Sequence, residues 1–271
     1  MTVTIHVTGG LGNQLFQIFT LISYSLKHKK AFYFEKSIPT RKDRPFYWNN
    51  FLKSLVPFIK DGTEIQLLYR EPNFHYNELP LISQSIKFFG YYQSYKYFEK
   101  NKHSIEKFIR LEEQRNMLKN DYDFSNLVCL HFRVGDYVNL QHHHPLMPIE
   151  YYRNALQQLI KTTDKDNWKI LYFCEDNDIN YVNEKVNSLK TDYPNLSFQK
   201  IDSKYQDWEQ MLIMSLCQHN IIANSTFSWW GAYLNKNVDK LVFYPCKWFG
   251  PALVEKNTND LFPNDWIKIN F

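Results

Sequence analysis

Segments with the hydrophobic pattern of a strand alternate with segments that have the hydrophobic spacing of a helix. This alternation is most regular in the second half of the chain. Short apolar runs there are each followed by a segment whose apolar residues recur at helical spacing. The predicted strand and helix pairs are 127–132 with 150–161, 168–174 with 179–189, 196–201 with 208–219, and 220–223 with 227–234, and a last strand is 240–244. Strands that alternate with helices form parallel sheets with right-handed crossovers, so we expect a doubly wound α/β sheet.

The first half begins in the same way but becomes irregular. Residues 3–7 alternate as a strand does, a glycine-rich turn follows, and apolar residues recur at helical spacing over 15–26. This predicts a Rossmann-like start. Residues 31–34 and 86–92 are further predicted strands, 97–119 is a predicted charged helix, and prolines divide 35–85 into short pieces. We therefore expect two domains, residues 1–120 and 121–271.

Composition narrows the class of partner. At 271 residues and 44% hydrophobic, the chain is large enough for two cores. Its formal charge is +4, and Lys and Arg are interspersed with acids, so we do not expect a nucleic-acid partner. The four cysteines are far apart, without a C-x-x-C pair, which is typical of reduced thiols. The first lysine is Lys27 and no apolar run is long enough to span a membrane, so we expect a cytoplasmic protein.

Polar residues gather after the predicted strands of the second half, at the ends where doubly wound sheets bind ligands. They are His131, Arg133, Gly135 and Asp136 after the first strand, Glu175, Asp176 and Asp178 after the second, Asp202 and Ser203 after the third, and Asn224, Ser225 and Thr226 after the fourth. An arginine offers two parallel, permanently charged hydrogen bonds to a diphosphate. A helix that begins with Ser and Thr adds backbone N–H donors and the positive end of its dipole. These residue types together predict a nucleotide-binding edge.

Simpler interpretations of the same residues stay open at this point. Arg133 and Asp136 are close enough in sequence to form an ordinary ion pair at the end of a strand. His131, between two apolar residues, fits a buried core histidine. Ser225 fits an ordinary helix N-cap, and Asp176 fits a cap of the next helix.

The turn after the first strand contains three glycines, of which Gly10 and Gly12 precede Asn13 and Gln14. It looks like a dinucleotide-binding turn, but Leu15 occupies the third glycine position and no G-K-[ST] follows. Glycines let a ligand or another backbone approach closely. A tight turn between a strand and a helix explains them equally well.

Four segments together resemble the α-1,2-fucosyltransferases of glycosyltransferase family 11, which use GDP-L-fucose. They are G-G-L-G-N-Q-L-F-Q at 9–17, G-Y-Y-Q-S-Y-K-Y-F at 90–98, H-F-R-V-G-D-Y-V at 131–138, and A-N-S-T-F-S-W-W-G-A at 223–232. The segments occur in the family's order across nearly the whole chain. Two positions depart from the family's pattern: Val134 stands where a second arginine is common, and Cys174-Glu175-Asp176 replaces Ser-Asp-Asp.

The resemblance implies a two-domain fold of the GT-B type, with the donor nucleotide on the second domain and the acceptor in the cleft between the domains. It implies that Arg133 binds the diphosphate and stabilises the leaving group, with Asp136 as the candidate base. The remaining implied contacts are His131 with the nucleotide, Asp176 with the guanine or ribose, Asn224, Ser225 and Thr226 near the phosphates, and Gly10, Gly12, Asn13 and Gln14 on the opposite wall of the cleft.

The implied reaction moves L-fucose from GDP-L-fucose to the 2-hydroxyl of a galactoside, with inversion and without a metal or other cofactor. The partners would be a nucleotide sugar and an oligosaccharide or glycan acceptor. One alternative is a metal-dependent transferase for another nucleotide sugar, because Asp176-Asn177-Asp178 has the D-x-D spacing of a divalent-cation site. Another is a non-catalytic carbohydrate-binding protein that uses its many aromatic residues to stack on sugars.

Overall fold

The computed structural model describes residues 1–36, 44–62, 65 and 67–271. The chain forms two compact units. The N-terminal unit comprises Met1–Gln114 and Lys256–Pro263, and the C-terminal unit comprises Arg115–Glu255 and Asn264–Phe271. The division falls inside the short helix α3 (Leu111–Leu118), slightly before the predicted boundary after residue 120. The return of residues 256–263 to the N-terminal unit was not predicted from the sequence.

The N-terminal unit contains a parallel sheet of four strands in the order β2-β1-β6-β5. Their bounds are β1 (Thr2–Ile5), β2 (Ala31–Phe32), β5 (Leu68–Arg70) and β6 (Ile86–Phe89). A separate pair, β3 (Phe34–Glu35) and β4 (Ile59–Lys60), is also parallel, and a 3-10 helix, η1 (Lys53–Phe58), precedes β4. The chain passes from β1 to β2 on one side and later adds β6 and β5 on the other side, so the sheet has a topological switch point between β1 and β6.

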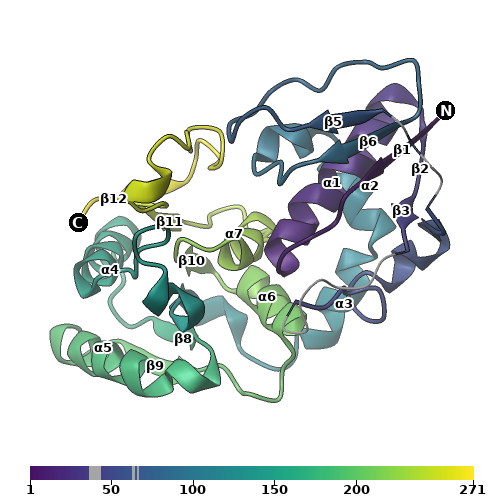
Figure 1. Cartoon of the computed structure of the whole chain (residues 1–271). Helices are drawn as coiled ribbons and strands as arrows, with labels where there is room; N and C mark the ends of the chain where they lie inside the picture. The colour runs from purple at the N-terminus through teal and green to yellow at the C-terminus, as the bar shows by residue number, and fades with distance from the viewer. Residues whose placement is uncertain (37–43, 63–64, 66) are drawn as a thin grey trace. The chain divides into compact units, whose positions relative to one another are not determined.

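Helix α1 (Leu11–His28) connects β1 to β2 and lies beside the sheet (Figure 1). It is longer than the predicted helix 15–26, because Leu11 and Gly12 of the glycine turn already belong to its first turn. Nearly every residue from Leu11 to Ser25 is buried, so packing on several sides stabilises it. The helix ends where Lys29 adopts a left-handed conformation, with φ of 52°.

The predicted continuous helix 97–119 is wrong. The structure has two 3-10 turns, η2 (Tyr95–Tyr97) and η3 (Glu99–Asn101), followed by α2 (Lys102–Phe108) and then α3. Arg110, between the two helices, has a left-handed φ of 52°, which interrupts the helical hydrogen bonds. The charged residues of the segment carried no signal for this break.

The C-terminal unit contains a parallel sheet of six strands in the order β12-β11-β10-β7-β8-β9. The strands are β7 (Leu127–His131), β8 (Lys169–Phe173), β9 (Ser197–Lys200), β10 (His219–Ile221), β11 (Val242–Pro245) and β12 (Ile267–Ile269). From β7 the chain adds strands in one direction to β9 and then in the other from β10 to β12. This is the doubly wound arrangement predicted from the sequence, with its switch point between β7 and β10.

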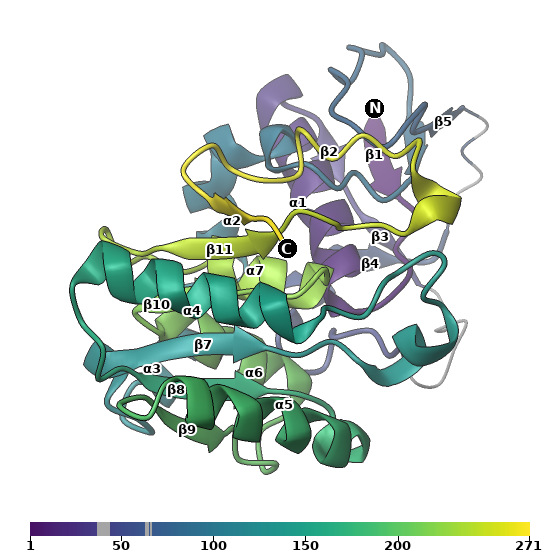
Figure 2. The same ribbon diagram turned by 90° about the vertical axis from the view of Figure 1, so that its left-hand side faces the viewer.

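Helices cover both faces of this sheet. They are α4 (Ile149–Thr163), α5 (Ile179–Asp192), α6 (Asp207–Leu216) and α7 (Thr226–Tyr233). Figure 2 shows α4 and α5 on one face, where the main core cluster includes Leu130, Ile170 and Tyr152. Alternate residues of the strands face α6 and α7, as the buried hydrogen bond from Asn220 Nδ2 to the Met214 carbonyl shows. Apolar residues on both faces explain why these strands read as continuous apolar runs.

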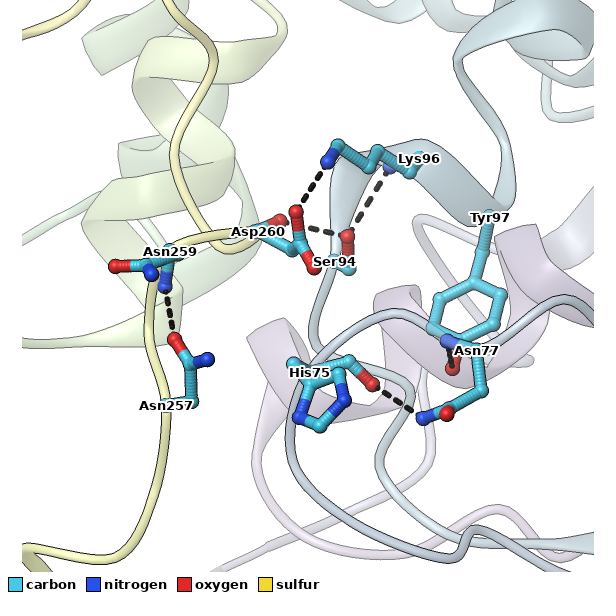
Figure 3. Close-up of polar contacts among 8 residues, drawn as sticks. All are labelled: His75, Asn77, Ser94, Lys96, Tyr97, Asn257, Asn259 and Asp260. Atoms are coloured by element: carbon cyan, nitrogen blue, oxygen red, sulfur yellow. Dashed lines mark hydrogen bonds and ion pairs between the residues drawn. The ribbon is translucent and has the colours of Figure 1, made fainter.

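The segment 256–263 belongs to the N-terminal unit through contacts with residues 74–96. The Ser94 hydroxyl donates a hydrogen bond of 2.6 Å to the Asp260 carbonyl, and the Lys96 ammonium forms an ion pair with the Asp260 carboxylate (Figure 3). The Lys256 ammonium lies 5.4 Å from the centre of the Phe74 ring. These contacts attach a segment late in the sequence to the segment 90–98.

All four cysteines are free thiols, and three of them are buried, as expected from their apolar neighbours. Within residues 1–36, 44–62, 65 and 67–271, no helix combines the length and the apolar character needed to cross a membrane.

Candidate functional site

The carboxyl ends of β7 and β10 flank the switch point of the C-terminal sheet. His131 ends β7, and Arg133 and Asp136 follow it. Asn224 and Ser225 follow β10 and lead into α7. Adjacent strands that diverge in connectivity leave a crevice at this edge, and ligands of doubly wound sheets bind there. The structure thus brings the predicted residues after these two strands to the same edge.

Arg133 is the central charge of this edge. Its guanidinium forms ion pairs with the carboxylates of Asp136 and Glu175, and its Cζ lies 4.9 Å from the centre of the Tyr137 ring. Burial acts to lower the pKa of Arg133, but the neighbouring Tyr137 hydroxyl and the two carboxylates together raise it above its ordinary value. Arg133 is therefore permanently charged and held in one orientation by groups on three sides.

Gly135 lets the two ion pairs approach the backbone. Its φ is +39°, and a Cβ at this position would lie 3.1 Å from Glu175 Oε1 and 3.3 Å from Arg133 Nη1. Its backbone N–H donates a hydrogen bond of 2.8 Å to Asp178 Oδ2. The loop after β7 is consequently tied to the loop after β8.

His131 is 5% exposed, and its Nδ1 has no hydrogen-bond partner among the residues that the structure describes. Its ring centre lies 5.7 Å from that of Phe227, in the first turn of α7. Burial, with a smaller contribution from the Arg133 charge, lowers the pKa of His131 to about 3. The imidazole is therefore neutral at working pH, and its unpartnered nitrogen lies near the start of a helix, where a ligand atom would satisfy it.

The start of α7 has the cap predicted from the sequence. Ser225 is the N-cap, its hydroxyl accepts a hydrogen bond of 3.3 Å from the Phe227 N–H, and Thr226 is the first helical residue. Asn224 does not point into solvent: it is 1% exposed, and its Nδ2 donates to the carbonyls of Pro145 and Trp248. Its Oδ1 is buried without a partner within the described chain. Asn224 therefore connects the loop before the cap to the segments that contain Pro145 and Trp248.

Asp176 has different neighbours from those expected. Its carboxylate forms an ion pair with Lys200 and accepts a hydrogen bond of 2.9 Å from the Ser203 hydroxyl. These two hydrogen bonds lower the pKa of Asp176. The preceding residue, Glu175, contacts Arg133 instead. The structure thus brings Arg133 and Ser225 to the switch point, while Asp176 faces the outer strand β9, so the contact with guanine or ribose stays a prediction.

Val134, where an arginine is common in the resembled family, does not face the same edge. It is 4% exposed and lies in the hydrophobic core cluster with Phe132 and Met147. The departure from the family's pattern at this position therefore places an apolar side chain inside the unit.

The two carboxylates of the D-x-D segment are engaged separately, Asp176 by Lys200 and Asp178 by the Gly135 amide. Across the part of the chain that the structure describes, no group of three or more His, Cys, Asp or Glu side chains is arranged to hold a metal ion.

The glycine turn of the N-terminal unit follows β1, at the switch point of its own sheet. Gly10 is the N-cap of α1, and a Cβ there would meet no atom within 4 Å, so this side of the turn is open. Gly9 has a φ of +85°, and a Cβ there would lie 2.8 Å from Asn13 Nδ2. Gly12 is buried within the first turn of α1. A glycine is thus required at Gly9 for close packing.

Asn13 and Gln14 have opposite surroundings. Asn13 Oδ1 accepts a hydrogen bond of 3.0 Å from Gln93 Nε2, which follows β6 across the switch point. Gln14 is fully buried, and its Nε2 donates to the carbonyls of Gly9 at 2.9 Å and Pro45 at 2.8 Å. Gln14 therefore supports the turn from inside, and the expected ligand contact is better placed at Asn13.

Glu175 was predicted to lie at this edge, but its pairing with Arg133 was not predicted. Two residues with roles in the turns of the N-terminal sheet were not predicted: Gln17 links the two turns, and Glu71 accepts hydrogen bonds from the turn after β6. Gln17 lay in a segment that carried the family resemblance. Glu71 lies in the irregular region between the prolines, where no sequence pattern pointed to it.

Comparisons with known proteins identify the family of this chain. The sequence matches the family "Glycosyl transferase family 11" over residues 1–270. It is 28% identical to the Escherichia coli O-antigen biosynthesis glycosyltransferase WbnK, across 97% of this chain and 99% of that protein. It is 29% identical to an E. coli α-1,2-colitosyltransferase, across 68% of this chain and 63% of that protein. A galactoside 2-α-L-fucosyltransferase from Caenorhabditis elegans is 25% identical, across 98% of this chain and 79% of that protein.

Solved structures share the fold at low sequence identity. The E. coli ADP-heptose heptosyltransferase II has a TM-score of 0.52 and 11% identity, covering 99% of this chain and 89% of that one. A mutant of Arabidopsis thaliana FUT1 in complex with GDP has a TM-score of 0.51 and 11% identity, covering 97% of this chain and 72% of that one. The predicted GT-B fold is thereby confirmed. Because the family match spans nearly the whole chain, the protein belongs to glycosyl transferase family 11 and is a glycosyltransferase similar to the α-1,2-fucosyltransferases.

Proposed function

We propose that the protein transfers L-fucose from GDP-L-fucose to the 2-hydroxyl of a galactoside, with inversion and without a metal ion. The C-terminal unit would bind GDP, and the glycine turn of the N-terminal unit would contribute to acceptor binding. A C. elegans relative is named for this linkage, and a solved structure of the same fold holds GDP.

The observation that supports the proposal most strongly is the arrangement at the switch point of the C-terminal sheet. Arg133 offers a fixed positive charge after β7, and α7 begins with the Ser225 cap after β10. Guanidinium groups and helix N-termini both bind phosphate oxygens. The unpartnered Nδ1 of the buried His131 adds a third group near the start of α7.

The proposed step is a direct displacement. The acceptor oxygen forms a bond to the anomeric carbon while the bond from that carbon to the diphosphate oxygen breaks, and the electron pair leaves with GDP. Negative charge develops on the departing phosphate, so a preorganised cation there stabilises the transition state. Arg133 would supply this charge, held in place by Asp136 and Glu175.

Two roles were open for Asp136, and its geometry supports one of them. Its carboxylate is engaged with the guanidinium of Arg133. A base that removes the acceptor proton must reach the acceptor hydroxyl, whereas an orienting group needs only this ion pair. We therefore place Asp136 as the residue that orients Arg133 and leave the base unassigned.

Metal independence is supported by the separate partners of Asp176 and Asp178. A cation that bridges a diphosphate needs carboxylates that converge, and these two bond to Lys200 and to the Gly135 amide. An assay with excess chelator tests this point. Full activity is expected, and loss of activity that Mg²⁺ or Mn²⁺ restores would support the metal-dependent alternative.

A donor screen tests the main proposal. GDP should bind with micromolar affinity in calorimetry, as is typical of substrates. Among GDP-, UDP- and dTDP-sugars, GDP-L-fucose should be hydrolysed and should label lactose in an α-1,2 linkage, identified by NMR of the product. Preference for a UDP- or dTDP-sugar would refute the assignment, and sugar binding without any GDP affinity would indicate a non-catalytic carbohydrate-binding protein.

GDP-colitose is a second candidate donor. An α-1,2-colitosyltransferase is among the relatives, and the contacts proposed above involve the nucleotide and not the sugar. The same screen decides between the two sugars from their kcat/KM ratio.

A further inference from the structure

The switch point of the N-terminal sheet lies between β1 and β6, and the residues that follow these strands meet there. Gly9 to Gln14 follow β1, and Gly90 to Gln93 follow β6. The hydrogen bond of 3.0 Å from Gln93 Nε2 to Asn13 Oδ1 joins the two segments. By the rule that applies to open parallel sheets, a ligand of this unit binds beside these two turns.

A carboxylate from the neighbouring edge strand holds the second turn. Glu71, directly after β5, accepts hydrogen bonds from the backbone N–H of Tyr91 at 2.7 Å and from that of Tyr92 at 3.0 Å, and both of its oxygens lie 3.0 Å from the Tyr92 nitrogen. A Cβ on Gly90 would lie only 2.4 Å from Glu71 Cβ. The side chain thus lies directly against the backbone of the turn.

The turn needs this support because one of its residues is strained. Tyr92 has a φ of +53°, a left-handed conformation that costs about 1–2 kcal/mol for a residue other than glycine. Tyr92 is also fully buried. Two hydrogen bonds to a carboxylate offset such a cost, since bonds to charged groups are among the stronger ones in proteins.

Two glutamines link this turn to the glycine turn by hydrogen bonds. Gln17 Nε2 donates a hydrogen bond of 3.1 Å to the Gly90 carbonyl, and Gln17 Oε1 accepts one of 2.9 Å from the Thr8 N–H. Gln93 then fixes Asn13 through the bond described above. Hydrogen bonds thus connect Asn13 to the turn that Glu71 contacts, and Glu71 lies two strands away.

We infer that Glu71 is a positioning residue for acceptor binding: its carboxylate fixes the turn after β6, and through Gln93 this turn sets the orientation of Asn13. The inference rests on the proposed function, in which the N-terminal unit contributes to acceptor binding. Glu71 is not a catalytic base, because its two oxygens are committed to the N–H groups of Tyr91 and Tyr92.

The charge of Glu71 gives this role a pH signature. Burial raises the pKa of the Glu71 carboxyl, and the N–H donors of Tyr92 and Tyr91 and the charge of Lys256 offset this only in part. The other titratable groups that face it are the hydroxyls of Tyr69, Tyr92 and Tyr97, whose pKa values burial raises, so they stay neutral in acid. As pH rises above 4.5, the ordinary pKa of glutamate, Glu71 is therefore the group in this cluster that changes charge.

The effects on stability and on function have opposite signs. Because the folded-state pKa of Glu71 lies above its ordinary value, its contribution to stability is fully present below that ordinary value and is lost as pH rises through the folded-state pKa. The turn, however, is bound best by the ionised form, which presents two acceptor oxygens to two N–H groups. The KM for the acceptor should therefore fall as pH rises through the folded-state pKa.

Glu71→Gln tests the inference, because it keeps the shape of the side chain and removes one acceptor oxygen. The matched control is Glu78→Gln in the same unit, where Glu78 is exposed and pairs with Lys27 at 2.8 Å. With lactose as acceptor, Glu71→Gln should raise the KM for lactose about tenfold or more. The GDP affinity of this variant and its rate of GDP-L-fucose hydrolysis without acceptor should equal those of the wild type. The increase in the KM for lactose that we expect at acid pH should be absent from the variant.

Hydrogen exchange provides a readout that does not require turnover. In Glu71→Gln the amides of 90–93 and of 9–14 should exchange faster, whereas Glu78→Gln should leave both segments unchanged. Unchanged exchange at 9–14, or an unchanged lactose KM, would overturn the inference. An equal loss of GDP affinity would also overturn it, because the damage would then be general.

The two proposals fail in distinguishable ways. If the wild-type protein binds no GDP, the proposed function fails, and the exchange at 9–14 alone decides whether Glu71 positions Asn13. If GDP binds and lactose is fucosylated but Glu71→Gln behaves as Glu78→Gln, only the role of Glu71 is refuted.

Discussion

Glu175 forms an ion pair with Arg133 across the ends of the adjacent strands β7 and β8. The carboxylate of Asp136 binds the same guanidinium from its own loop. Two negative groups thus hold one positive group at the edge where we propose that the diphosphate binds. Binding of GDP would exchange part of this pairing for phosphate oxygens, which suits a cation that must be preorganised before the reaction.

Replacing Arg133 tests the importance of this charge. Arg133→Ala should lower kcat/KM by roughly two to three orders of magnitude, as the loss of one preorganised donor does elsewhere. The circular dichroism spectrum and the unfolding midpoint should change little. Arg153→Ala is the control, because Arg153 lies on α4 of the same unit and pairs with Asp192 at its surface. Near wild-type turnover in Arg133→Ala would remove the proposed role.

Asp136→Asn separates an orienting residue from a base. If Asp136 orients Arg133, the variant should bind GDP about tenfold more weakly, since hydrogen bonds to charged groups contribute about 1.5–3 kcal/mol. The pH dependence of kcat should keep the wild-type shape. Calorimetry and a pH–rate profile measure both quantities. Unchanged GDP affinity together with loss of the acid limb of kcat would instead assign Asp136 as the base.

The elements of the second half of the chain were predictable because short-range hydrophobic periodicity determines them. Every predicted strand and helix from 127 to 244 corresponds to an element of the structure, with ends displaced by a few residues. β12 was missed because Ile267–Ile269 is short and has no following helix to pair with. In the first half, β5 was missed because Leu68–Arg70 is equally short and lies between prolines.

The site was predictable only as far as strand ends determine it. Arg133 and Ser225 follow adjacent strands, so topology alone brings them to one edge. Whether Glu175 or Asp176 faces Arg133 depends on the conformation of one loop, and neighbouring carboxylates look alike in sequence. Glu71 is a longer-range case, since its partners are backbone N–H groups about twenty residues away, which no sequence pattern records.

His131 predicts a specific loss of stability in acid. Burial lowers the pKa of His131 to about 3, against an ordinary value of 6.5. Its contribution to stability is therefore complete above pH 6.5 and is lost progressively as pH falls toward 3, by up to about 1.4 kcal/mol per pH unit. Urea unfolding followed by tryptophan fluorescence, to which Trp229 and Trp230 of the same unit contribute, measures this loss.

His131→Gln should flatten this pH dependence, and His103→Gln, at an exposed position of α2, should not. Burial also lowers the pKa of His219 to about 4, so a part of the acid sensitivity should persist in His131→Gln. An identical slope in His131→Gln and in the wild type would show that the imidazole is protonated in the folded protein.

Gly231 should be the most sensitive glycine of the α6–α7 contact. A Cβ there would lie 2.7 Å from Met214 Cβ on α6, and rotation of the Met214 side chain does not move that atom. Gly231→Ala should therefore force the helices apart and cost about 1–3 kcal/mol by overpacking. Alanine's higher helix propensity, worth about 1 kcal/mol, offsets only part of this. Gly62→Ala is the control, since a Cβ at that position would lie 3.9 Å from the Glu35 side chain. Equal midpoints of urea unfolding for the two variants would contradict the packing argument.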